Sequence, residues 1–460
     1  MSGFLHGVEI VQLNNGVRPI QTVRSSVIGL VGTAAQGPVN TPTLIAGNRT
    51  EAIKTFGADW GTIPDAIDAI FDQAGAMVIV INVGDPAVQV KHETESLTFG
   101  ADDTVEVTHD TIKNVSVTDG ASEPTTYTEG VDYTYDGDTG EFTRAAEGNI
   151  SEGGTVSISY DRWDENSVTV DQVSGGVDET GARTGVKALL DAESVLGVQP
   201  KILIAPHYTS QVDVADGAIS GAPVTTEMVS IAERLRAVVV ADAPAIPAKD
   251  ADAPAKAYRD LFGSERVYVV DPAVRVWDSV ANGPAVAPAS ERVAGVIVKN
   301  DHERGFWTSP SNREINGIVG TARGIDFTLG DRNARANVLN ENEIATIIQK
   351  DGYRLWGNRT CSSDPLWAFL SHVRTNDMIL ESLLRAHMWA VDRNITKTYI
   401  EDVTEGVNAY LAKLTAQGAI SGGRCWANPE LNTETTMDAG QIYFDFDYGR
   451  YGVAEHVTFR

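Results

Sequence analysis

Cysteine is scarce in this chain of 460 residues, which contains only Cys361 and Cys425. Two cysteines that form no C-x-x-C pair exclude a disulfide framework and a cysteine-rich zinc site. They fit synthesis in a reducing, cytosolic compartment. No apolar run approaches the roughly 20 residues that a membrane-spanning helix needs, and the start lacks a basic stretch followed by an apolar one. We therefore expect neither a membrane span nor a secretory signal.

Positive charge is also in short supply. The chain has 36 Lys and Arg against 63 Asp and Glu, which gives a formal net charge of −27. A broad surface for nucleic acid or for an anionic membrane needs clustered Lys and Arg, so the composition argues against both partners. The hydrophobic fraction of 42% is typical of a folded chain, and the length predicts two to four domains.

Motifs for cofactors and metals are missing as well. Gly32 and Gly37 have the spacing of a phosphate-binding loop, but Pro38 and Val39 stand where Lys and Ser or Thr are required. The histidines are scattered, and neither an H-E-x-x-H metal motif nor a G-x-S-x-G nucleophile elbow occurs. We expect no cofactor, no metal and no enzymatic activity.

One enzymatic alternative stays open. His207, Asp242 and Asp271 follow predicted strands, and the carboxyl ends of parallel strands are where α/β enzymes place their sites. Ser309 could complete a Ser/His/Asp set of an α/β hydrolase or peptidase. Asp and His also end strands simply by capping the next turn or helix, which is the simpler interpretation.

The pattern of apolar residues predicts an α/β domain. Short runs rich in Val and Ile predict buried parallel strands, at 26–32, 77–83, 201–205, 237–242 and 266–271. Helical periods lie between them, which favours a doubly wound sheet.

Helix signals accompany these strands. One helix is predicted to start at Asn48 and end at Gly57, and another to run from near Pro64 to Gly75. A further helix is expected to begin at Val186. The Ala- and Pro-rich stretch 243–257 is expected to be a surface connection.

Between about residues 91 and 170 the helical period disappears. Thr, Val, Tyr and Asp alternate there, with strands expected at 104–109, 114–120, 131–144 and 155–160. The DGDTG stretch within the third of these segments predicts a hairpin turn. The segment therefore predicts an antiparallel β domain inserted into the α/β domain.

The last 115 residues combine helices with strands. An apolar spacing of three and four predicts one face of a long helix, formed by Leu380, Leu384, Met388, Val391 and Ile395. A second helix should end at Gly418. Strand-like segments follow at 442–449 and 455–460. In the first of them a period of two places the larger side chains on one face, namely Ile442, Phe444, Phe446 and Tyr448.

The first 24 residues also contain a strand pattern, around a turn-prone Asn-Asn-Gly. Its apolar residues are Val8, Ile10, Val11 and Leu13. Strands this short need a sheet to join. That sheet is either the subunit's own or one in a neighbouring chain, reached by an arm.

Three segments together resemble the tail sheath proteins of contractile-tailed bacteriophages, especially the P2-like branch and the R-type pyocin sheaths. They are FLHGVEIVQLNNGVRPIQTVRSSVIGLVGTA (4–34), SPSNREINGIVG (309–320) and LNENEIATIIQKDGYRLWGNRTCSSDP (339–365). The chain departs from the family in having Asn342 and Glu343 where a Gly is common. We expect the motif residues to act structurally; they are Ser309, Pro310, Ser311, Asn312, Trp356, Gly357, Asn358, Arg359 and Thr360.

The resemblance implies a division into domains. An N-terminal arm would span 1–24, and a subtilisin-like α/β domain without the protease signatures would combine 25–90 with 171–345. The insert 91–170 would be sandwich-like and outward-facing. Residues 346–460 would form an α+β C-terminal domain that faces the inner tube, and both chain ends would be extended arms.

The resemblance also implies a function. Sheath subunits stack as hexameric rings around a tube and contract to drive the tube through a bacterial envelope. The implied partners are further copies of the chain, the tail tube protein, and the baseplate and tail terminator proteins. The implied location is the virion, after assembly in the host cytoplasm. The sheath of a phage-derived secretion or injection system would share this mechanism.

Overall fold

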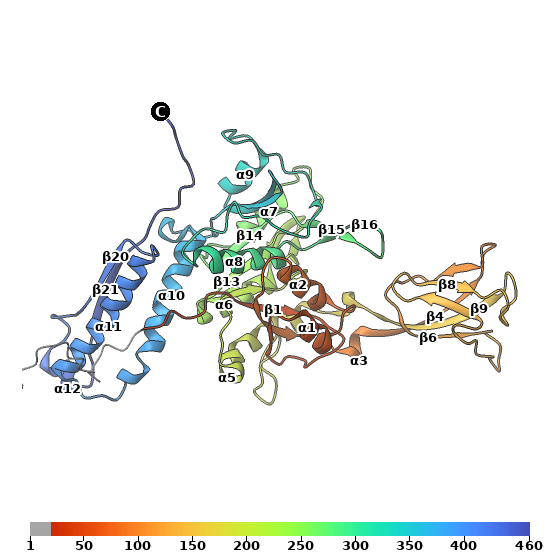
Figure 1. Cartoon of the computed structure of the whole chain (residues 1–460), viewed down its shortest axis with the longest axis horizontal. Helices are drawn as coiled ribbons and strands as arrows, with labels where there is room; N and C mark the ends of the chain where they lie inside the picture. Colours follow the sequence, from red (N-terminus) through yellow and green to blue (C-terminus); the bar gives the residue numbers. More distant parts are fainter. Residues whose placement is uncertain (1–19) are drawn as a thin grey trace, which may run out of the picture. The chain divides into compact units, whose positions relative to one another are not determined.

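The structure, a computed structural model, describes residues 20–460. The chain forms two compact units (Figure 1). The larger unit contains residues 25–374. The smaller unit combines residues 20–24 with residues 375–460.

A mixed sheet of eight strands forms the centre of the larger unit, in the order β19-β18-β14-β13-β10-β1-β3-β2. The six inner strands are parallel, and the two edge strands run antiparallel to their neighbours. The five predicted strands are confirmed to within two residues. The bounds are β1 (Val27–Gly32), β2 (Thr43–Ala46), β3 (Met77–Asn82), β10 (Ile202–Ile204), β13 (Val238–Asp242), β14 (Val267–Val270), β18 (Ile344–Gln349) and β19 (Tyr353–Trp356).

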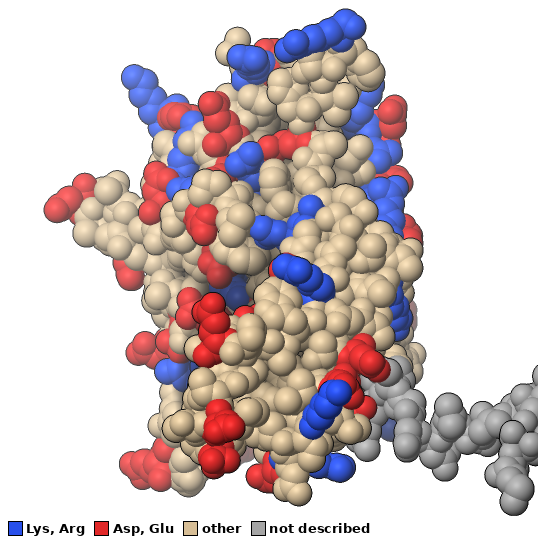
Figure 2. Space-filling view, turned by 90° about the vertical axis from the view of Figure 1, so that its left-hand side faces the viewer, with Lys and Arg blue, Asp and Glu red and all other residues tan. Residues whose placement is uncertain are grey.

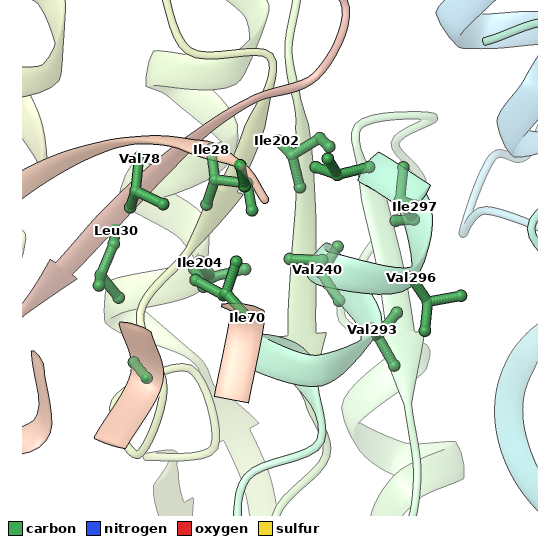
Figure 3. Packing of buried hydrophobic residues seen from close by; sticks show 14 of the residues in the cluster. Ile28, Leu30, Ile70, Val78, Ile202, Ile204, Val240, Val293, Val296 and Ile297 are labelled. Carbon is green, nitrogen blue, oxygen red and sulfur yellow. The ribbon is translucent and has the colours of Figure 1, made fainter. Parts of the chain in front are cut away.

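Each face of this sheet has its own hydrophobic core. Ile28 and Leu30 of β1 pack on one side, against α2 (Thr62–Phe71) and α8 (Ser290–Arg304) (Figure 3). Val27 and Val31 point to the opposite side, which is covered by α6 (Pro223–Leu235) and the 3-10 helix η2 (Gly185–Asp191). Alternate residues of a strand face opposite sides, so a strand buried on both faces must be apolar throughout.

The first helix begins and ends as predicted. In α1 (Arg49–Phe56) the Asn48 side chain accepts a hydrogen bond from the backbone nitrogen of Thr50 at 3.0 Å, and Gly57 follows the last turn. Helix α2 ends at Phe71, earlier than the predicted Gly75.

Two other expectations are corrected. The stretch 243–257 is not wholly a surface connection, because α7 (Ala253–Arg259) begins in it and buries Ala255 and Tyr258. These two side chains pack against the sheet, which Pro and Ala composition alone does not reveal. The helix expected from Val186 starts as η2, and α5 (Ala192–Leu196) continues it.

The segment between α3 (Pro86–Gln89) and α4 (Val170–Ser174) is antiparallel, with no α-helix among its residues. Two three-stranded sheets, β4-β9-β6 and β5-β8-β7, form this segment (Figure 1). They enclose a core that includes Phe142, Ile158 and Tyr160. The predicted hairpin joins β7 to β8. The bounds are β4 (Val90–Thr98), β5 (Thr104–Glu106), β6 (Lys113–Thr118), β7 (Tyr133–Asp136), β8 (Glu141–Arg144) and β9 (Thr155–Trp163).

Specific contacts attach this β segment to the sheet domain. The Trp60 indole donates a hydrogen bond to the Thr111 carbonyl at 2.6 Å. The Glu165 carboxylate accepts hydrogen bonds from the Trp163 indole, at 2.6 Å, and from the Thr33 hydroxyl at the end of β1, at 2.9 Å. The segment therefore returns to the carboxyl edge of the central sheet.

The larger unit also contains smaller elements. They are the 3-10 helices η1 (Glu165–Ser167) and η3 (Pro365–Trp367), strands β11 (Asp213–Ala215), β12 (Ala218–Gly221), β15 (Val274–Asp278), β16 (Gly283–Ala287) and β17 (Gly320–Thr321), and helix α9 (Arg335–Glu341). Helix α10 (Leu370–Ala386) begins in this unit and continues in the smaller one.

The long helix predicted through Leu380, Leu384, Met388, Val391 and Ile395 is confirmed for the first two residues, and its continuation to Ile395 is wrong. Helix α10 ends at Ala386, and a 3-10 helix, η4 (Met388–Ala390), follows. The backbone is then extended at Val391 and left-handed at Asp392, where φ is 61°, so helical geometry cannot continue. The apolar positions beyond Leu380 are largely exposed, with 66% at Leu384, 79% at Met388 and 64% at Val391.

The smaller unit is otherwise close to expectation. Helix α11 (Lys397–Ala416) packs on β20 (Gly422–Ala427), which pairs with β21 (Phe444–Gly449); α12 (Glu434–Asp438) lies between the strands in sequence. The strand expected at 455–460 is not formed. Residues 450–460 have no regular secondary structure, and Phe459 is 94% exposed.

Candidate functional site

The SPSN segment lies beside strand β19. Ser309 accepts a hydrogen bond from the backbone nitrogen of Ser311 at 3.2 Å, which closes a tight turn over the buried Pro310. The backbone of Asn312 is left-handed, with φ 62°, and its nitrogen donates to the Leu355 carbonyl at 2.6 Å. Asn tolerates this conformation better than most residues. The Ser309 hydrogen bond and the left-handed Asn312 therefore explain how the backbone turns at SPSN.

The WGNRT segment continues directly from β19 and meets SPSN. The Gly357 nitrogen donates to the Ser311 hydroxyl at 3.0 Å, and the Gly357 carbonyl accepts from the Tyr268 hydroxyl at 2.7 Å. Gly357 has φ 132°, and a β-carbon there would lie 2.8 Å from the α-carbon of Ala345. Two motifs 44 residues apart, counted from Asn312 to Trp356, thus form one joint at the end of the sheet.

The other WGNRT residues are held by their neighbours. The Trp356 ring packs edge-on against Phe327 with centroids 4.9 Å apart, and the Arg359 guanidinium lies 5.2 Å above the Phe369 ring. The Asn358 carbonyl accepts a hydrogen bond from the Leu370 nitrogen at 2.9 Å. These contacts fasten the motif to the beginning of α10.

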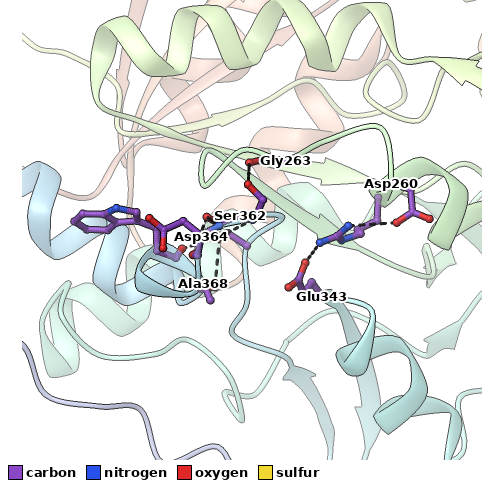
Figure 4. Close-up of polar contacts among 10 residues, drawn as sticks. Asp260, Gly263, Glu343, Ser362, Asp364 and Ala368 are labelled. Carbon is purple, nitrogen blue, oxygen red and sulfur yellow. Dashed lines mark hydrogen bonds and ion pairs between the residues drawn. The ribbon is translucent and has the colours of Figure 1, made fainter.

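Polar contacts extend from Thr360 to the loop after α7 (Figure 4). Thr360 donates through its nitrogen to the Ala368 carbonyl at 2.8 Å, and Ser362 donates through its hydroxyl to the Asp364 carbonyl at 3.1 Å. The neighbouring Arg259 forms ion pairs with Glu343 and Asp260. Glu343 has a left-handed backbone with φ 59°, a conformation that glycine adopts more readily.

The sequence analysis did not identify two residues outside the motifs that hydrogen-bond to the WGNRT segment. Tyr268 lies in β14, and Asn340 in α9 donates to the Trp356 carbonyl at 3.0 Å. A single Tyr within the aliphatic run RVYVVD was the available signal, because a buried phenol needs a hydrogen-bond acceptor.

The four residues of the enzymatic alternative form no hydrogen-bonded set, although His207 acts electrostatically on Asp242 and partly opposes the rise in its pKa that burial causes. Among residues 20–460 no hydrogen bond joins any two of His207, Asp242, Asp271 and Ser309. The Asp242 carboxylate accepts from the backbone nitrogens of Ala289 and Ser290, at 2.9 and 2.8 Å. It therefore anchors the start of α8.

The two carboxylates are buried for structural reasons. Burial raises the pKa of Asp242, and the hydrogen bonds from Ser290 only partly oppose this. Burial also raises the pKa of Asp271, while its ion pair with Arg323 lowers it. His207 is exposed, and its backbone φ is 69°.

The two cysteines are buried thiols. Burial raises the pKa of Cys361 to about 12 and that of Cys425 to about 11. Within residues 20–460 no group of three or more His, Cys, Asp or Glu side chains is placed to hold a metal ion. No helix in this described part is long and apolar enough to cross a membrane.

The predicted C-terminal arm forms part of a hairpin. Phe446 lies opposite Cys425 of β20, and the Tyr448 hydroxyl donates a hydrogen bond to the Asn376 amide oxygen at 2.7 Å. Phe444, Phe446 and Tyr448 are half-buried, as is Ile442 just before the strand. The other half of the predicted arms, Val8, Ile10, Val11 and Leu13, lies outside the described residues.

This hairpin has open edges in the described part of the chain. Its sheet contains only β20 and β21 there, so one side of each strand has no strand partner among residues 20–460. A groove of about 530 Å³ lies along the hairpin and is lined by Ser421–Arg424 and Asp447–Gly449. A larger groove of about 1180 Å³ lies elsewhere in the same unit, between the segment after η4 and α12.

Charge is distributed unevenly along the chain. The face in Figure 2 carries both signs, with Lys and Arg interspersed among Asp and Glu and wide uncharged areas between them. Residues 91–170, in contrast, contain 18 Asp and Glu against four Lys and Arg, a net charge of −14. Two of these four cations, Arg144 and Arg162, form ion pairs within the segment, with Asp103 and Glu93.

Comparison with known proteins supplies the family. The profile "Phage tail sheath protein central domain" matches residues 181–361, and "Phage tail sheath C-terminal domain" matches 362–460. A third profile, "Tail sheath protein Gp18 domain III N-terminal region", matches 25–83.

Relatives with similar sequences align with nearly the whole chain. A prophage major tail sheath protein of Pseudomonas aeruginosa (strain UCBPP-PA14) is 36% identical, covering 99% of this chain and 96% of the relative. The tail sheath protein of Escherichia phage P2 is 32% identical, covering 100% and 96%. The contracted helical sheath of the anti-feeding prophage has a similar fold, with a TM-score of 0.60 at 16% identity, covering 100% of this chain and 99% of that chain. The chain belongs to the phage tail sheath proteins, the structural proteins of contractile tails.

Proposed function

We propose that this protein is the subunit of a contractile sheath that stacks as hexameric rings around an inner tube and contracts to drive the tube through a bacterial envelope. The observation that carries the proposal is the match to sheath proteins over the whole chain at 32–36% identity. Its partners would be further copies of itself, the tube protein, and the baseplate and terminator proteins. Assembly would take place in the host cytoplasm, and the sheath would form part of the virion.

The proposed energy source is a difference between two packings of the same subunits. Packed interfaces are bistable, so a small change per subunit adds up when many subunits act together. The mechanism needs no nucleotide or other cofactor. The motif residues from Ser309 to Asn312 and from Trp356 to Thr360 would serve as a structural joint within each subunit.

The domain division is part of the same proposal. The subtilisin-like domain would combine 25–90 with 171–345, the insert 91–170 would face outward, and 346–460 would face the tube. The sandwich of the insert and the eight-stranded sheet are compatible with this division.

The arms are proposed to connect neighbouring subunits. A strand edge without a partner can accept a strand from another chain, and the hairpin of β20 and β21 offers such edges beside a groove. We propose that Val8, Ile10, Val11 and Leu13 of one subunit add a strand there, and that the β21 hairpin is the receiving element.

Electron microscopy tests both proposals on the purified protein. The full chain should form rings or tubes. A variant lacking residues 1–19 should stay folded with an unchanged melting temperature but form no tubes; Ile20 is retained because it is only 5% exposed. The matched control carries the same 19 residues in permuted order, which keeps length and charge but breaks the strand pattern.

The outcomes separate the two ideas. A full chain that stays monomeric under all assembly conditions contradicts the sheath proposal. Normal tubes from the truncated or permuted chain contradict the arm proposal alone. A truncated chain that melts several degrees lower shows that the arm completes the subunit's own fold instead.

A further inference from the structure

The chain passes between the two units twice, and both passages meet at one buried carboxylate. The first passage lies between Arg24 and Ser25, and the second between Arg374 and Thr375, within α10. Asp301, near the end of α8, contacts the residue on the larger unit's side of each passage. Its side chain is 1% exposed, and that of Arg374 is 3% exposed.

At the second passage, Asp301 and Arg374 form a bidentate ion pair, which is a strong geometry for a carboxylate and a guanidinium. Arg374 donates through both terminal nitrogens to both Asp301 carboxylate oxygens, each at 2.6 Å. Two parallel, charge-assisted hydrogen bonds fix the guanidinium in the plane of the carboxylate. Removing one partner would leave the other charge buried and unpaired, which is costly.

The contacts with the first passage involve the same atoms. The hydroxyls of Ser25 and Ser26 donate to one Asp301 oxygen at 2.8 and 3.1 Å. Arg374 also donates to the Ser25 carbonyl at 3.1 Å. The extended segment that enters the larger unit is thus bonded directly to the helix that leaves it.

A second set of contacts joins the same two segments within the smaller unit. The Val23 nitrogen donates to the Ser382 hydroxyl of α10 at 3.0 Å, and the Thr22 hydroxyl lies 3.2 Å from that of Tyr410 in α11. Ile20, at the beginning of this segment, is 5% exposed. The segment is therefore held to α10 on both sides of the passage.

We infer that Asp301 ties the two passages into a single connection, so that any reorientation between the units must carry residues 20–26 and α10 together. A connection of two independently flexible segments would allow the units to separate locally, one passage at a time. The tied connection instead transmits displacement of the smaller unit to the core helix α8. This inference concerns one isolated subunit and does not depend on the proposed polymer.

Hydrogen exchange with mass spectrometry on the full chain tests it. In D301N, exchange should become at least tenfold faster in peptides from both passages, 20–30 and 370–386. The matched control is D271N, which removes a buried carboxylate paired with Arg323 elsewhere in the larger unit. Exchange at both passages in D271N should stay within twofold of the unchanged chain.

A milder variant covers the possibility that D301N does not fold. The double substitution S25A/S26A removes two donors to Asp301 but keeps its pair with Arg374, and it should accelerate both passages by a smaller factor. Faster exchange at one passage only, or an equal rise throughout the larger unit, overturns the inference. No change in either variant also overturns it.

Discussion

Gly357 shows how one residue constrains the joint of the two motifs. Its φ of 132° is rare for any residue with a β-carbon, and such a carbon would lie 2.8 Å from the backbone of Ala345. Both its nitrogen and its carbonyl are hydrogen-bonded, to Ser311 and Tyr268. Glycine is therefore required by the backbone conformation and by the close approach of β18.

Gly357→Ala should consequently destabilise the larger unit by about 1–3 kcal/mol, the range for a strained backbone conformation and a close contact. Urea unfolding measured by circular dichroism would give the difference. The control is Gly324→Ala, because Gly324 has no neighbouring atom within 4 Å of the added β-carbon. Equal losses of stability from the two substitutions would contradict the claim that the joint requires glycine at position 357.

Glu291 makes stability depend on pH. Burial raises its pKa to about 8, with Arg292 opposing and the nearby Asp242 and Asp65 adding to the rise. Between the ordinary Glu value and pH 8, the folded chain holds a proton that the unfolded chain has lost. The free energy of unfolding should therefore fall as pH rises through this range, by up to about 1.4 kcal/mol per pH unit, and become level above it.

Glu291→Gln tests that dependence, because the amide cannot ionise. The variant should lose stability less steeply than the unchanged chain between pH 5 and 8, in urea titrations at several pH values. Glu179→Gln, at an exposed position, is the control and should leave the slope unchanged. Parallel pH profiles for all three proteins would contradict the assignment.

At the scale of elements, Asp242 links a strand to a helix. It ends β13 and accepts hydrogen bonds from the Ala289 and Ser290 nitrogens and from the Ser290 hydroxyl. Asp242→Ala would leave these donors buried without a partner, at about 1–3 kcal/mol for each such group. Thermal unfolding should show a loss of several degrees, against little change for the exposed Asp213→Ala. A loss confined to a hydrolytic activity, with unchanged stability, would favour the enzymatic alternative instead.

Elements were predictable where burial matches a simple period. The parallel strands are apolar on both faces, so β1, β3 and β13 could be read directly from the sequence. Helix α8 could not, because most of its residues are buried and these include polar ones such as Glu291 and Asp301. The partners of Asp301, Ser25 and Arg374, lie far away in sequence. Strand β4 also lacked a signal, since its alternating side chains are mostly polar and only half-buried.

The prediction of a helix beyond Ala386 failed because apolar residues with a helical spacing are not buried there. The spacing of Leu384, Met388 and Val391 is that of a buried helix face, yet all three are mostly exposed. A periodic pattern records which residues are apolar but not which surface covers them. The joint of the two motifs was also only partly predictable. Its two segments could be recognised in the sequence, but the hydrogen bonds of Tyr268 and Asn340 to them depend on the folded sheet.

At the scale of the whole molecule, the β segment should be separable. The backbone nitrogen of Asp164 donates to the Gln89 carbonyl at 2.8 Å, so the two ends of the segment adjoin. Replacing residues 91–162 by a three-residue Gly/Ser linker keeps Trp163 and Glu165 with their contacts. The shortened chain should unfold cooperatively in calorimetry. Its free energy of unfolding should be lower by about 1 kcal/mol, because the Trp60 hydrogen bond to Thr111 is lost. Aggregation or non-cooperative unfolding would contradict the predicted domain boundary.

The same deletion tests how charge governs assembly. Residues 91–170 carry −14 of the net charge of −27, and like-charged domains repel one another over about 10 Å at 0.1 M salt. If subunits polymerise as proposed, assembly brings these domains together, so the full chain should form tubes more readily at 0.5 M than at 0.05 M NaCl. The shortened chain, without most of that charge, should depend less on salt. Light scattering with electron microscopy of the same samples measures both, and an identical salt dependence of the two proteins would show that repulsion between the β segments does not limit assembly.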